Sequence, residues 1–184
     1  MIRLDSLDLS IDKKEHIKRL AEDLTNIHLD FEYASDFKNA KELRDFVDAL
    51  TEIVWMPKMW RGRFILVTDE MNNNAIEYGS KPEDINRITF KVIKRQENIK
   101  MIVEVEDTWR WKAPKTAEQM YALKDEKIKI WFDTKNIWIR WRGLFLITQR
   151  TVDKLYFKDS TRWWLIVWVE KDIILKEDNI KEVA

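Results

Sequence analysis

The spacing of apolar residues changes near Gly79, and this change constrains the fold of the 184-residue chain more than any other feature. Before Gly79, apolar residues recur every three or four positions, as in amphipathic helices. After it, 88–93 and 99–106 are rich in β-branched residues, partly alternate, and flank a turn at 96–98. Helices and antiparallel strands without regular βαβ alternation predict an α+β fold. We expect a two-layer sandwich, with a mixed, mostly antiparallel sheet and helices on one face.

Three amphipathic helices are predicted in the N-terminal half. The first covers about Ser10–Asn26 with Ser10 as its N-cap, the second runs from near Asn39 to before Pro57, and the third covers about 63–78. A short strand is expected at 31–34. The inward-facing residues are expected to be Ile17, Leu20, Leu24, Ile27, Leu43, Phe46, Val47, Leu50, Val54, Phe64, Val67, Met71 and Ala75.

The C-terminal half is predicted to contain a long polar loop, a helix and two strands. The loop covers about 112–136 and includes one short helix, because Thr116 and Gln119 have the spacing of a capping box. A further helix is expected to start near Gly143. The last two strands are expected at 154–158 and 162–170. We therefore divide the chain into an N-terminal helical extension at 1–28, one domain at 29–171 and a charged tail at 172–184.

Composition excludes several classes of function. With 33 basic and 33 acidic residues the net charge is zero, so we expect neither nucleic acid nor membrane as a partner. The longest apolar runs are too short to cross a bilayer, and no signal peptide is expected. The absence of cysteine excludes disulfides, thiolate metal sites and cysteine nucleophiles. We expect a cytoplasmic protein, because a reducing compartment fits this composition.

Glu70 and Asn74 are the first candidate functional pair. They stand four residues apart on the third predicted helix, so their side chains share one face. An asparagine carbonyl oxygen suits Mg²⁺, and a carboxylate one turn away can orient or deprotonate an attacking oxygen in phosphoryl transfer. The alternative is a solvated polar face within the run 69–74.

Two further groups follow along the chain. Asp107 comes directly after a predicted strand, where its carboxylate can accept a hydrogen bond from an exocyclic amine such as that of adenine, or can serve as a turn residue. The segment Arg142–Ile147 opens a predicted helix, whose free N–H groups suit an anion. Each group alone is weak evidence of a site.

Taken in order, the three groups resemble a known set of motifs. The segments Glu70–Ala75, Asp107–Trp111 and Arg142–Ile147 resemble the N-box and two glycine boxes of the histidine-kinase-like ATPases, which include histidine kinases and gyrase B. The short form is closest to the anti-sigma-factor serine/threonine kinases, and the resemblance covers roughly 29–171. It implies a Bergerat-type ATP-binding fold.

The resemblance also implies roles for individual residues. Glu70 would be the catalytic general base, Asn74 would hold Mg²⁺ at the phosphates of ATP, and Asp107 would bind the adenine amine. Residues 112–136 would form a lid over ATP. The remaining ATP-binding residues would be Trp109, Trp111, Trp138, Arg140, Trp141, Arg142, Gly143 and Leu144.

Tryptophan at glycine positions is the main departure from this family. The chain has 3 glycines and 10 tryptophans, whereas about 7% glycine, or roughly 13 residues, is usual. Trp109, Trp111, Trp138 and Trp141 stand in the glycine boxes, where an indole would fill the nucleotide pocket. These tryptophans are ordinary core residues, or mark a pseudo-ATPase that has lost ATP, or are translated from UGA codons that the source reads as glycine. We favour the third explanation.

The function implied by the resemblance is an ATP-dependent protein serine/threonine kinase. It would transfer the γ-phosphate to a small antagonist protein and sequester a sigma factor. Two alternatives remain: the ATP-binding domain of a histidine-kinase-like signalling protein, and a non-catalytic binding module. We do not expect His16 to be a phosphoacceptor, because a lone histidine on a helix is usually a surface or interface residue. The N-terminal helix is expected to pack on the domain or to mediate homodimerisation.

Overall fold

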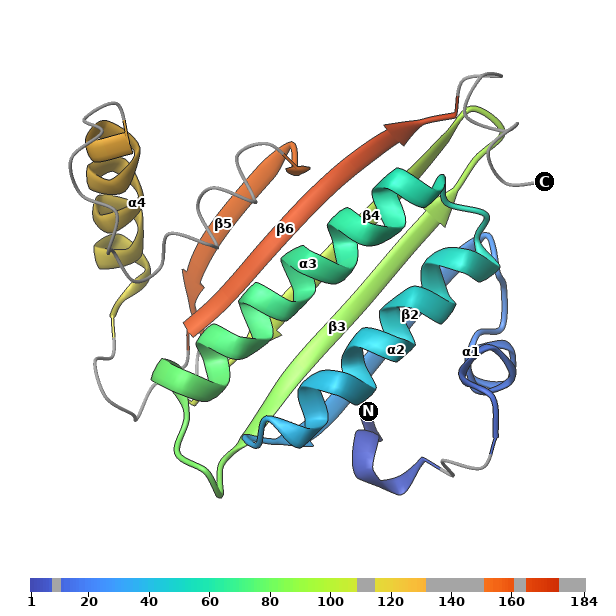
Figure 1. Ribbon diagram of the computed structural model, residues 1–184, viewed down its shortest axis with the longest axis horizontal. Coiled ribbons are helices and arrows are strands. Elements are labelled where there is room, and N and C mark those ends of the chain that lie inside the picture. The colour runs from blue at the N-terminus through green and yellow to red at the C-terminus, as the bar shows by residue number, and fades with distance from the viewer. Residues whose placement is uncertain (8–10, 109–114, 132–150, 161–164, 176–184) are drawn as a thin grey trace.

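A six-stranded mixed sheet covered on one face by two helices forms the body of the protein (Figure 1). The computed structural model describes residues 1–7, 11–108, 115–131, 151–160 and 165–175, with side chains except at 127–131. The strands are β1 (Ile2–Arg3), β2 (Asn26–Ala34), β3 (Ile85–Lys94), β4 (Asn98–Glu106), β5 (Lys154–Asp159) and β6 (Leu165–Ile174). The helices are η1 (Leu4–Ser6), α1 (Lys13–Leu20), α2 (Lys38–Ile53), α3 (Lys58–Asn74), the π-helix η2 (Ala75–Gly79) and α4 (Ala117–Trp131).

The strand order confirms the α+β prediction in its general form. The sheet runs β1-β2-β3-β4-β6-β5, and neighbouring strands are antiparallel except for β1 and β2, which are parallel. The expected hairpin is present, with β3 and β4 joined at 95–97. Helices α2 and α3 lie side by side on one face of this sheet (Figure 1).

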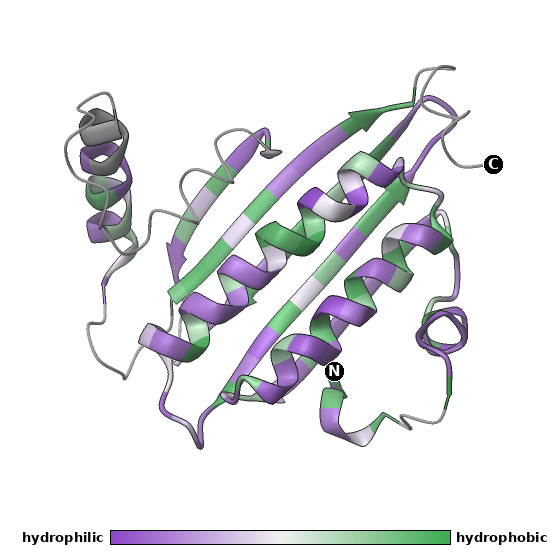
Figure 2. Cartoon of the chain, viewed as in Figure 1, coloured by the Kyte–Doolittle hydropathy of each residue, from purple (hydrophilic) through white to green (hydrophobic). Residues whose placement is uncertain are grey.

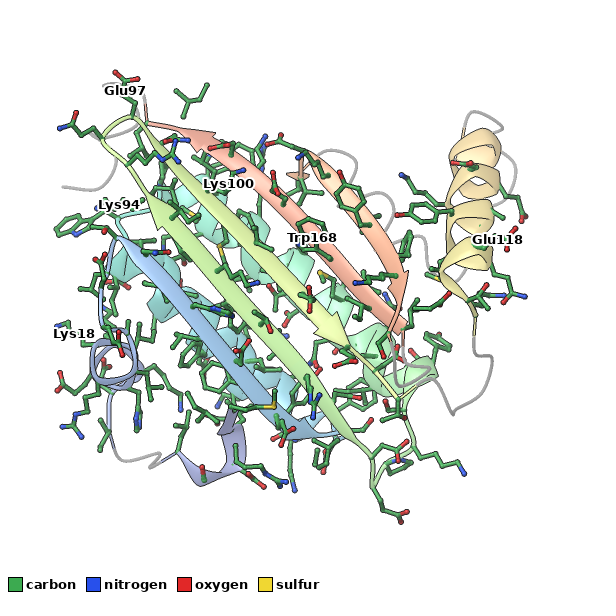
Figure 3. The ribbon with its side chains drawn as sticks, turned by 180° about the vertical axis from the view of Figure 1, so that it is seen from behind. Lys18, Lys94, Glu97, Lys100, Glu118 and Trp168 are labelled. Carbon is green, nitrogen blue, oxygen red and sulfur yellow. The ribbon has the colours of Figure 1, made fainter. Side chains whose placement is uncertain are left out.

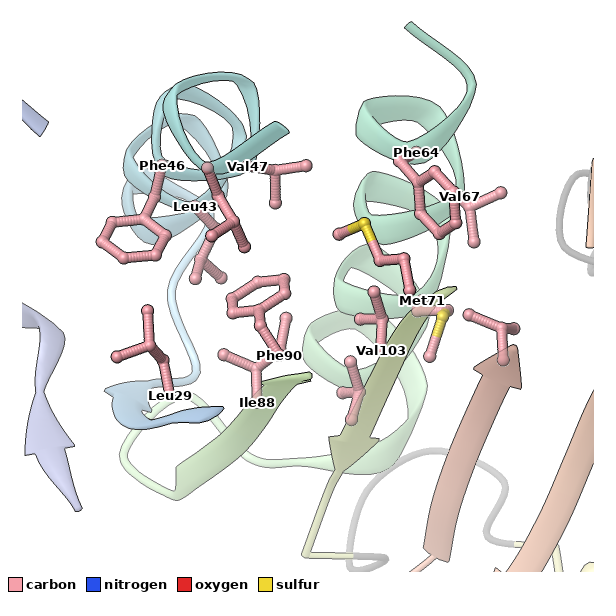
Figure 4. Packing of buried hydrophobic residues seen from close by; sticks show 14 of the residues in the cluster. Leu29, Leu43, Phe46, Val47, Phe64, Val67, Met71, Ile88, Phe90 and Val103 are labelled. Atoms are coloured by element: carbon pink, nitrogen blue, oxygen red, sulfur yellow. The ribbon is translucent and has the colours of Figure 1, made fainter. Parts of the chain in front are cut away.

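The core lies between the sheet and the two helices. Alternate residues of β2, β3, β4 and β6 are buried, which produces the banded hydropathy of the strands (Figure 2). Phe31 of β2, Phe46 of α2 and Phe90 of β3 pack together, with ring centroids 4.7 to 6.3 Å apart. Every inward-facing residue predicted for the second and third helices is buried in this cluster. Figure 4 shows part of the cluster.

The opposite face of the sheet is polar and is not covered by α2 or α3 (Figure 3). Arg87 lies between two carboxylates there, 2.9 Å from Glu32 and 3.6 Å from Glu106. Tyr156 and Trp168 stack on each other with ring centroids 4.8 Å apart. This face therefore combines ion pairs with one aromatic pair.

The first helix and first long strand differ from the prediction. The helix begins at Lys13 with Asp12 as its N-cap and ends at Leu20, whereas Ser10 lies outside the described residues. Ile27 is buried in β2 and Leu24 is 37% exposed, so neither belongs to the helical stripe. The strand begins at Asn26 rather than 31, because pairing with β3 buries alternate residues along all of 26–34.

Helix α1 packs on the rest of the domain, as one of the two alternatives predicted. Its Ile17 is fully buried in the core cluster. Lys13 pairs with Glu42 at 2.7 Å, and Lys14 pairs with Glu52 at 2.5 Å, so both lysines contact α2. The predicted boundary at 28/29 falls inside β2, and the boundary at 171/172 falls inside β6. Both ends of the described chain therefore contribute to one sheet.

A tight turn at Trp55 joins α2 to α3. Trp55 has φ of 62°, and it is the only non-glycine residue with positive φ among those that the structure describes. Its N–H donates to the Glu52 carbonyl at 2.9 Å, while the Met56 N–H donates to the Thr51 carbonyl at 2.9 Å. This pair of bonds is the Schellman motif, in which the left-handed position is usually glycine. Helix α3 then starts directly after Pro57, earlier than expected.

Helix α4 confirms the predicted capping box and is longer than predicted. The Thr116 N–H donates to Gln119 Oε1 at 3.0 Å, and the Gln119 N–H donates to Thr116 Oγ1 at 3.2 Å. The helix continues to Trp131. It lies beside the edge strand β5, where the Phe157 N–H donates to the Tyr121 hydroxyl at 3.1 Å.

The helix predicted from Gly143 lies outside the described residues. No helix in the described part of the chain is long and apolar enough to span a bilayer.

Candidate functional site

Glu70 and Asn74 lie near the end of α3, on the side turned away from α2. At 100° per residue, they share this side with Trp60, whose ring lies 4.9 Å from Nζ of Lys171 on β6. Glu70 is half-buried, and its burial raises the pKa of the carboxyl; the neighbouring Asp69 carboxylate raises it further. A carboxyl with a raised pKa is a better proton acceptor than an exposed one. Asn74 buries its Nδ2 without a hydrogen-bond partner.

A π-helical turn leads from Asn74 to Gly79, which contacts Asp107. Residues Ala75–Gly79 form η2 directly after Asn74, and π-helical turns are frequent at functional sites. The turn ends at Gly79, as predicted for the end of the third helix. A side chain at position 79 would overlap the carboxylate of Asp107. Gly79 is therefore required for the end of this helix to approach Asp107.

Asp107 follows the end of β4 and is buried, with only 5% of its surface exposed. Its backbone N–H donates to the carbonyl of Leu165 at 3.1 Å, which anchors it to β6. A buried carboxylate held by backbone can present an oxygen to a ligand at low entropic cost. The structure thus brings Asp107 against the end of η2, the helical turn that directly follows Asn74.

A buried network of hydrogen bonds surrounds Asp107. The Thr108 N–H donates to Ser80 Oγ at 2.9 Å, and Ser80 Oγ donates to Asn86 Oδ1 at 2.5 Å. The Thr108 hydroxyl donates to the Asp84 carboxylate at 2.5 Å, a shorter contact than its 3.2 Å approach to Ser80. The loop that follows Gly79 is therefore tied to the residue that follows Asp107.

Sequence reasoning did not identify Ser80, Asn86, Thr108 or Tyr33 as site residues. One signal was present: the inward positions of β3 are Asn86, Ile88, Phe90 and Val92, and only the first is polar. A polar residue in an otherwise apolar series needs a buried partner. Asn86 was therefore a detectable candidate, whereas the role of Ser80 depends on the turn that follows Gly79.

The phosphate end of the predicted site falls in segments that the structure does not describe. Eight predicted ATP-binding residues lie outside the described residues: Trp109, Trp111, Trp138, Arg140, Trp141, Arg142, Gly143 and Leu144. Their roles stay predictions. The part of the predicted lid that is described is helix α4.

Magnesium binding at Asn74 stays a prediction, and the described residues can offer the ion only part of a ligand set. They contain no group of three or more histidine, cysteine, aspartate or glutamate side chains that could hold a metal by itself. Magnesium at phosphates commonly keeps waters and uses only one or two protein ligands. Asn74, with Glu70 one turn before it, can supply such a contact.

Comparison with known proteins supports the fold alone. No protein-family model matches the chain, and no curated protein matches it. One solved structure with a similar fold is a chain in the SiaB-SiaC complex from Pseudomonas aeruginosa. It is 14% identical with a TM-score of 0.53, and the match covers 91% of this chain and 99% of that chain. The similarity therefore extends over nearly the whole of both chains.

Proposed function

We propose that this chain is an ATP-binding regulatory protein that acts as a protein serine/threonine kinase. The observation that supports this most is the approach of Gly79 to Asp107, because it brings the helical turn that follows the first predicted motif against the first residue of the second. In this proposal Asp107 accepts a hydrogen bond from the adenine amine, and the end of α3 faces the phosphates.

Glu70 would act as the general base in phosphoryl transfer. Its carboxylate would take the proton of a serine or threonine hydroxyl as that oxygen bonds to the γ-phosphorus of ATP, and ADP would leave. The raised pKa of Glu70, caused by burial and by the Asp69 carboxylate, makes its carboxylate a stronger base for this proton transfer. Asn74 would hold Mg²⁺, which neutralises charge on the phosphates when bound.

A protein partner is part of this proposal. The similar solved chain belongs to a complex of two proteins, which is consistent with a partner for this chain as well. A small antagonist protein would accept the phosphate, and a sigma factor would be held without being phosphorylated. His16 is 8% exposed on α1, which makes it poorly placed to accept a phosphate.

Glycine at 109, 111, 138 and 141 is also part of the proposal. Trp55 adds support from outside the nucleotide motifs, because it occupies the left-handed position of a Schellman motif. Tryptophan at a position that favours glycine is what translation of UGA as tryptophan would produce. UGG codons at these positions in the gene would contradict this explanation.

A nucleotide titration tests the proposal. Two proteins are titrated with Mg-ATP by calorimetry: the chain with tryptophan at 109, 111, 138 and 141, and a variant with glycine at these four positions. We expect binding by the glycine variant and none by the chain with tryptophan. Absence of binding by the glycine variant would refute the proposal. If neither form binds ATP and the chain still captures a regulator protein, the non-catalytic binding module is favoured. Tryptophans in the glycine boxes are the sequence feature that supports this alternative.

A labelling experiment separates the two kinds of kinase. The glycine variant is incubated with γ-labelled ATP and candidate regulator proteins, and the chemical stability of the product is measured. Label that survives acid and is lost in alkali indicates serine or threonine. Acid-labile label would instead indicate the histidine-kinase-like alternative.

A further inference from the structure

Tyr33, Asn86 and Asp107 form one row across three neighbouring strands. Tyr33 of β2 pairs with Asn86 of β3 in the register of the sheet. Arg87 pairs with Glu106, so Asn86 and Asp107 are the next facing positions on the β3–β4 ladder. Facing residues on one side of a sheet have Cβ atoms about 4.5–5.5 Å apart. The three side chains therefore lie within reach of one another.

This row is polar and buried beneath the end of the helix layer. Tyr33 and Asn86 have no exposed surface, and Asp107 is 5% exposed. The next row inward is Phe31, Ile88 and Val105, which are apolar. The apolar core thus changes to a polar site at one defined row of the sheet.

Two buried donors in the row make no hydrogen bond of normal geometry. They are the Tyr33 hydroxyl and the Asn86 Nδ2, which lie close enough to each other only for a weaker contact. A buried unpaired donor costs about 1–3 kcal/mol, so a native protein retains one for a reason. Burial raises the pKa of Tyr33 most, the negative charge of Asp107 raises it further, and the hydrogen-bonding contact with Asn86 lowers it. Both of the other residues in the row therefore affect the pKa of the Tyr33 hydroxyl.

We propose that Tyr33 and Asn86 are positioning residues for Asp107. When a 6-aminopurine nucleotide is bound, they donate to one carboxylate oxygen of Asp107, so that the other oxygen is held toward the exocyclic amine of that nucleotide. Ser80 supports this arrangement, because it occupies Asn86 Oδ1 and so leaves the amide donors of Asn86 turned toward the row. This inference depends on the proposed function, since it assigns the row to the same nucleotide site.

The test compares two nucleotides that differ in one group. ATP carries the 6-amino group, and purine riboside triphosphate lacks it. The protein is the full chain with glycine at 109, 111, 138 and 141. Tyr33→Phe removes only the hydroxyl, and Asn86→Leu removes the amide donors at nearly constant size without adding a charge beside Asp107. Tyr156→Phe is the matched control, because Tyr156 stacks on Trp168 on the other face of the sheet.

We expect Tyr33→Phe and Asn86→Leu to weaken ATP binding roughly three- to tenfold, the effect of one hydrogen bond. Their affinity for purine riboside triphosphate should match that of the parent, and Tyr156→Phe should bind both nucleotides as the parent does. Thermal unfolding checks that each variant is folded.

Several results would overturn the inference. Equal losses for both nucleotides would assign Tyr33 and Asn86 a structural role only, and no loss for either variant would exclude any role. A parent that binds both nucleotides equally well would show that the amine is not recognised, while leaving ATP binding intact. A parent that binds neither nucleotide would refute the proposed function and this inference together.

Discussion

At the scale of single residues, backbone conformation identifies Trp55 as the clearest misfit. A left-handed conformation costs an L-residue with a side chain roughly 1–2 kcal/mol, and glycine avoids this cost. The Trp55 indole is 65% exposed, so little packing compensates. By contrast, Trp60 is partly buried against the core, with the Arg63 guanidinium 4.6 Å from its ring centre. Substitution by glycine is therefore expected to change the stability of the fold in opposite directions at Trp55 and Trp60.

We predict that Trp55→Gly stabilises the fold by about 0.5–1 kcal/mol. Relief of the left-handed conformation exceeds the added flexibility that glycine gives the unfolded chain. Trp60→Gly serves as the comparison and should destabilise the protein, because it removes core contacts and places glycine in a helix. Urea denaturation measures both changes. A loss of stability for Trp55→Gly would contradict the prediction.

We predict that Glu70→Gln stabilises the protein more at neutral than at acidic pH. The folded state raises the pKa of Glu70, so its carboxyl favours folding when protonated, and that contribution is lost as pH rises through the folded pKa. Glutamine removes the charge at every pH. The difference should be modest, because the side chain is only half-buried. The free energy of unfolding of both proteins is measured at pH 4 and pH 8. Equal effects of the substitution at the two pH values would show that the raised pKa of Glu70 does not cause them. Glu70→Gln should also abolish phosphoryl transfer.

At the scale of elements, the end of the α3–η2 helix positions the candidate site. Five π-helical residues follow Asn74, and Gly79 then meets Asp107. Gly62 lies in the same helix but has open space where a Cβ would be. These two glycines allow the same substitution to be compared at a close approach and at a free surface.

We predict that Gly79→Ala destabilises the fold by about 1–3 kcal/mol, the usual cost of forcing extra atoms into a packed site. Gly62→Ala should stabilise it by about 0.5–1 kcal/mol, because alanine favours helix and meets no neighbour. Denaturant unfolding measures both variants. If Gly79→Ala were neutral, the contact between the helix end and Asp107 would not exist as described.

At the scale of the whole molecule, one apolar layer joins the sheet to α2 and α3. Phe90 lies at its centre, 6.3 Å from Phe31 and 6.0 Å from Phe46 between ring centroids. Figure 4 shows it on β3 below α2. The candidate site lies at one end of this layer, so its geometry depends on the stability of the layer as a whole.

We predict that Phe90→Ala destabilises the protein by about 3–5 kcal/mol, the usual cost of removing a buried aromatic side chain. This is a large share of the 5–15 kcal/mol that stabilises a typical domain. Tyr156→Ala, on the uncovered face, should cost much less, because Tyr156 is 37% exposed. Equilibrium unfolding in urea compares them. Similar losses for both variants would contradict the assignment of the core to one face.

Local periodicity was sufficient to predict most elements of the fold. The hairpin, the inward residues of α2 and α3 and the capping box of α4 depend on neighbours within a few positions, and all are confirmed. The beginning of β2 was predicted incorrectly. Ile27 fits a helical stripe, yet pairing with Val92 of β3 places it in the sheet. That choice is made by a strand distant in the sequence.

The sequence by itself determined the α+β class, the apolar faces and the three ordered motifs, because each is encoded by residue type at short spacing. Only the tertiary structure decided that Gly79 meets Asp107 and that Tyr33 and Asn86 extend the row beside it. These contacts join residues from separate strands and helices. Strand register and helix packing set them, and neither is a property of any one segment.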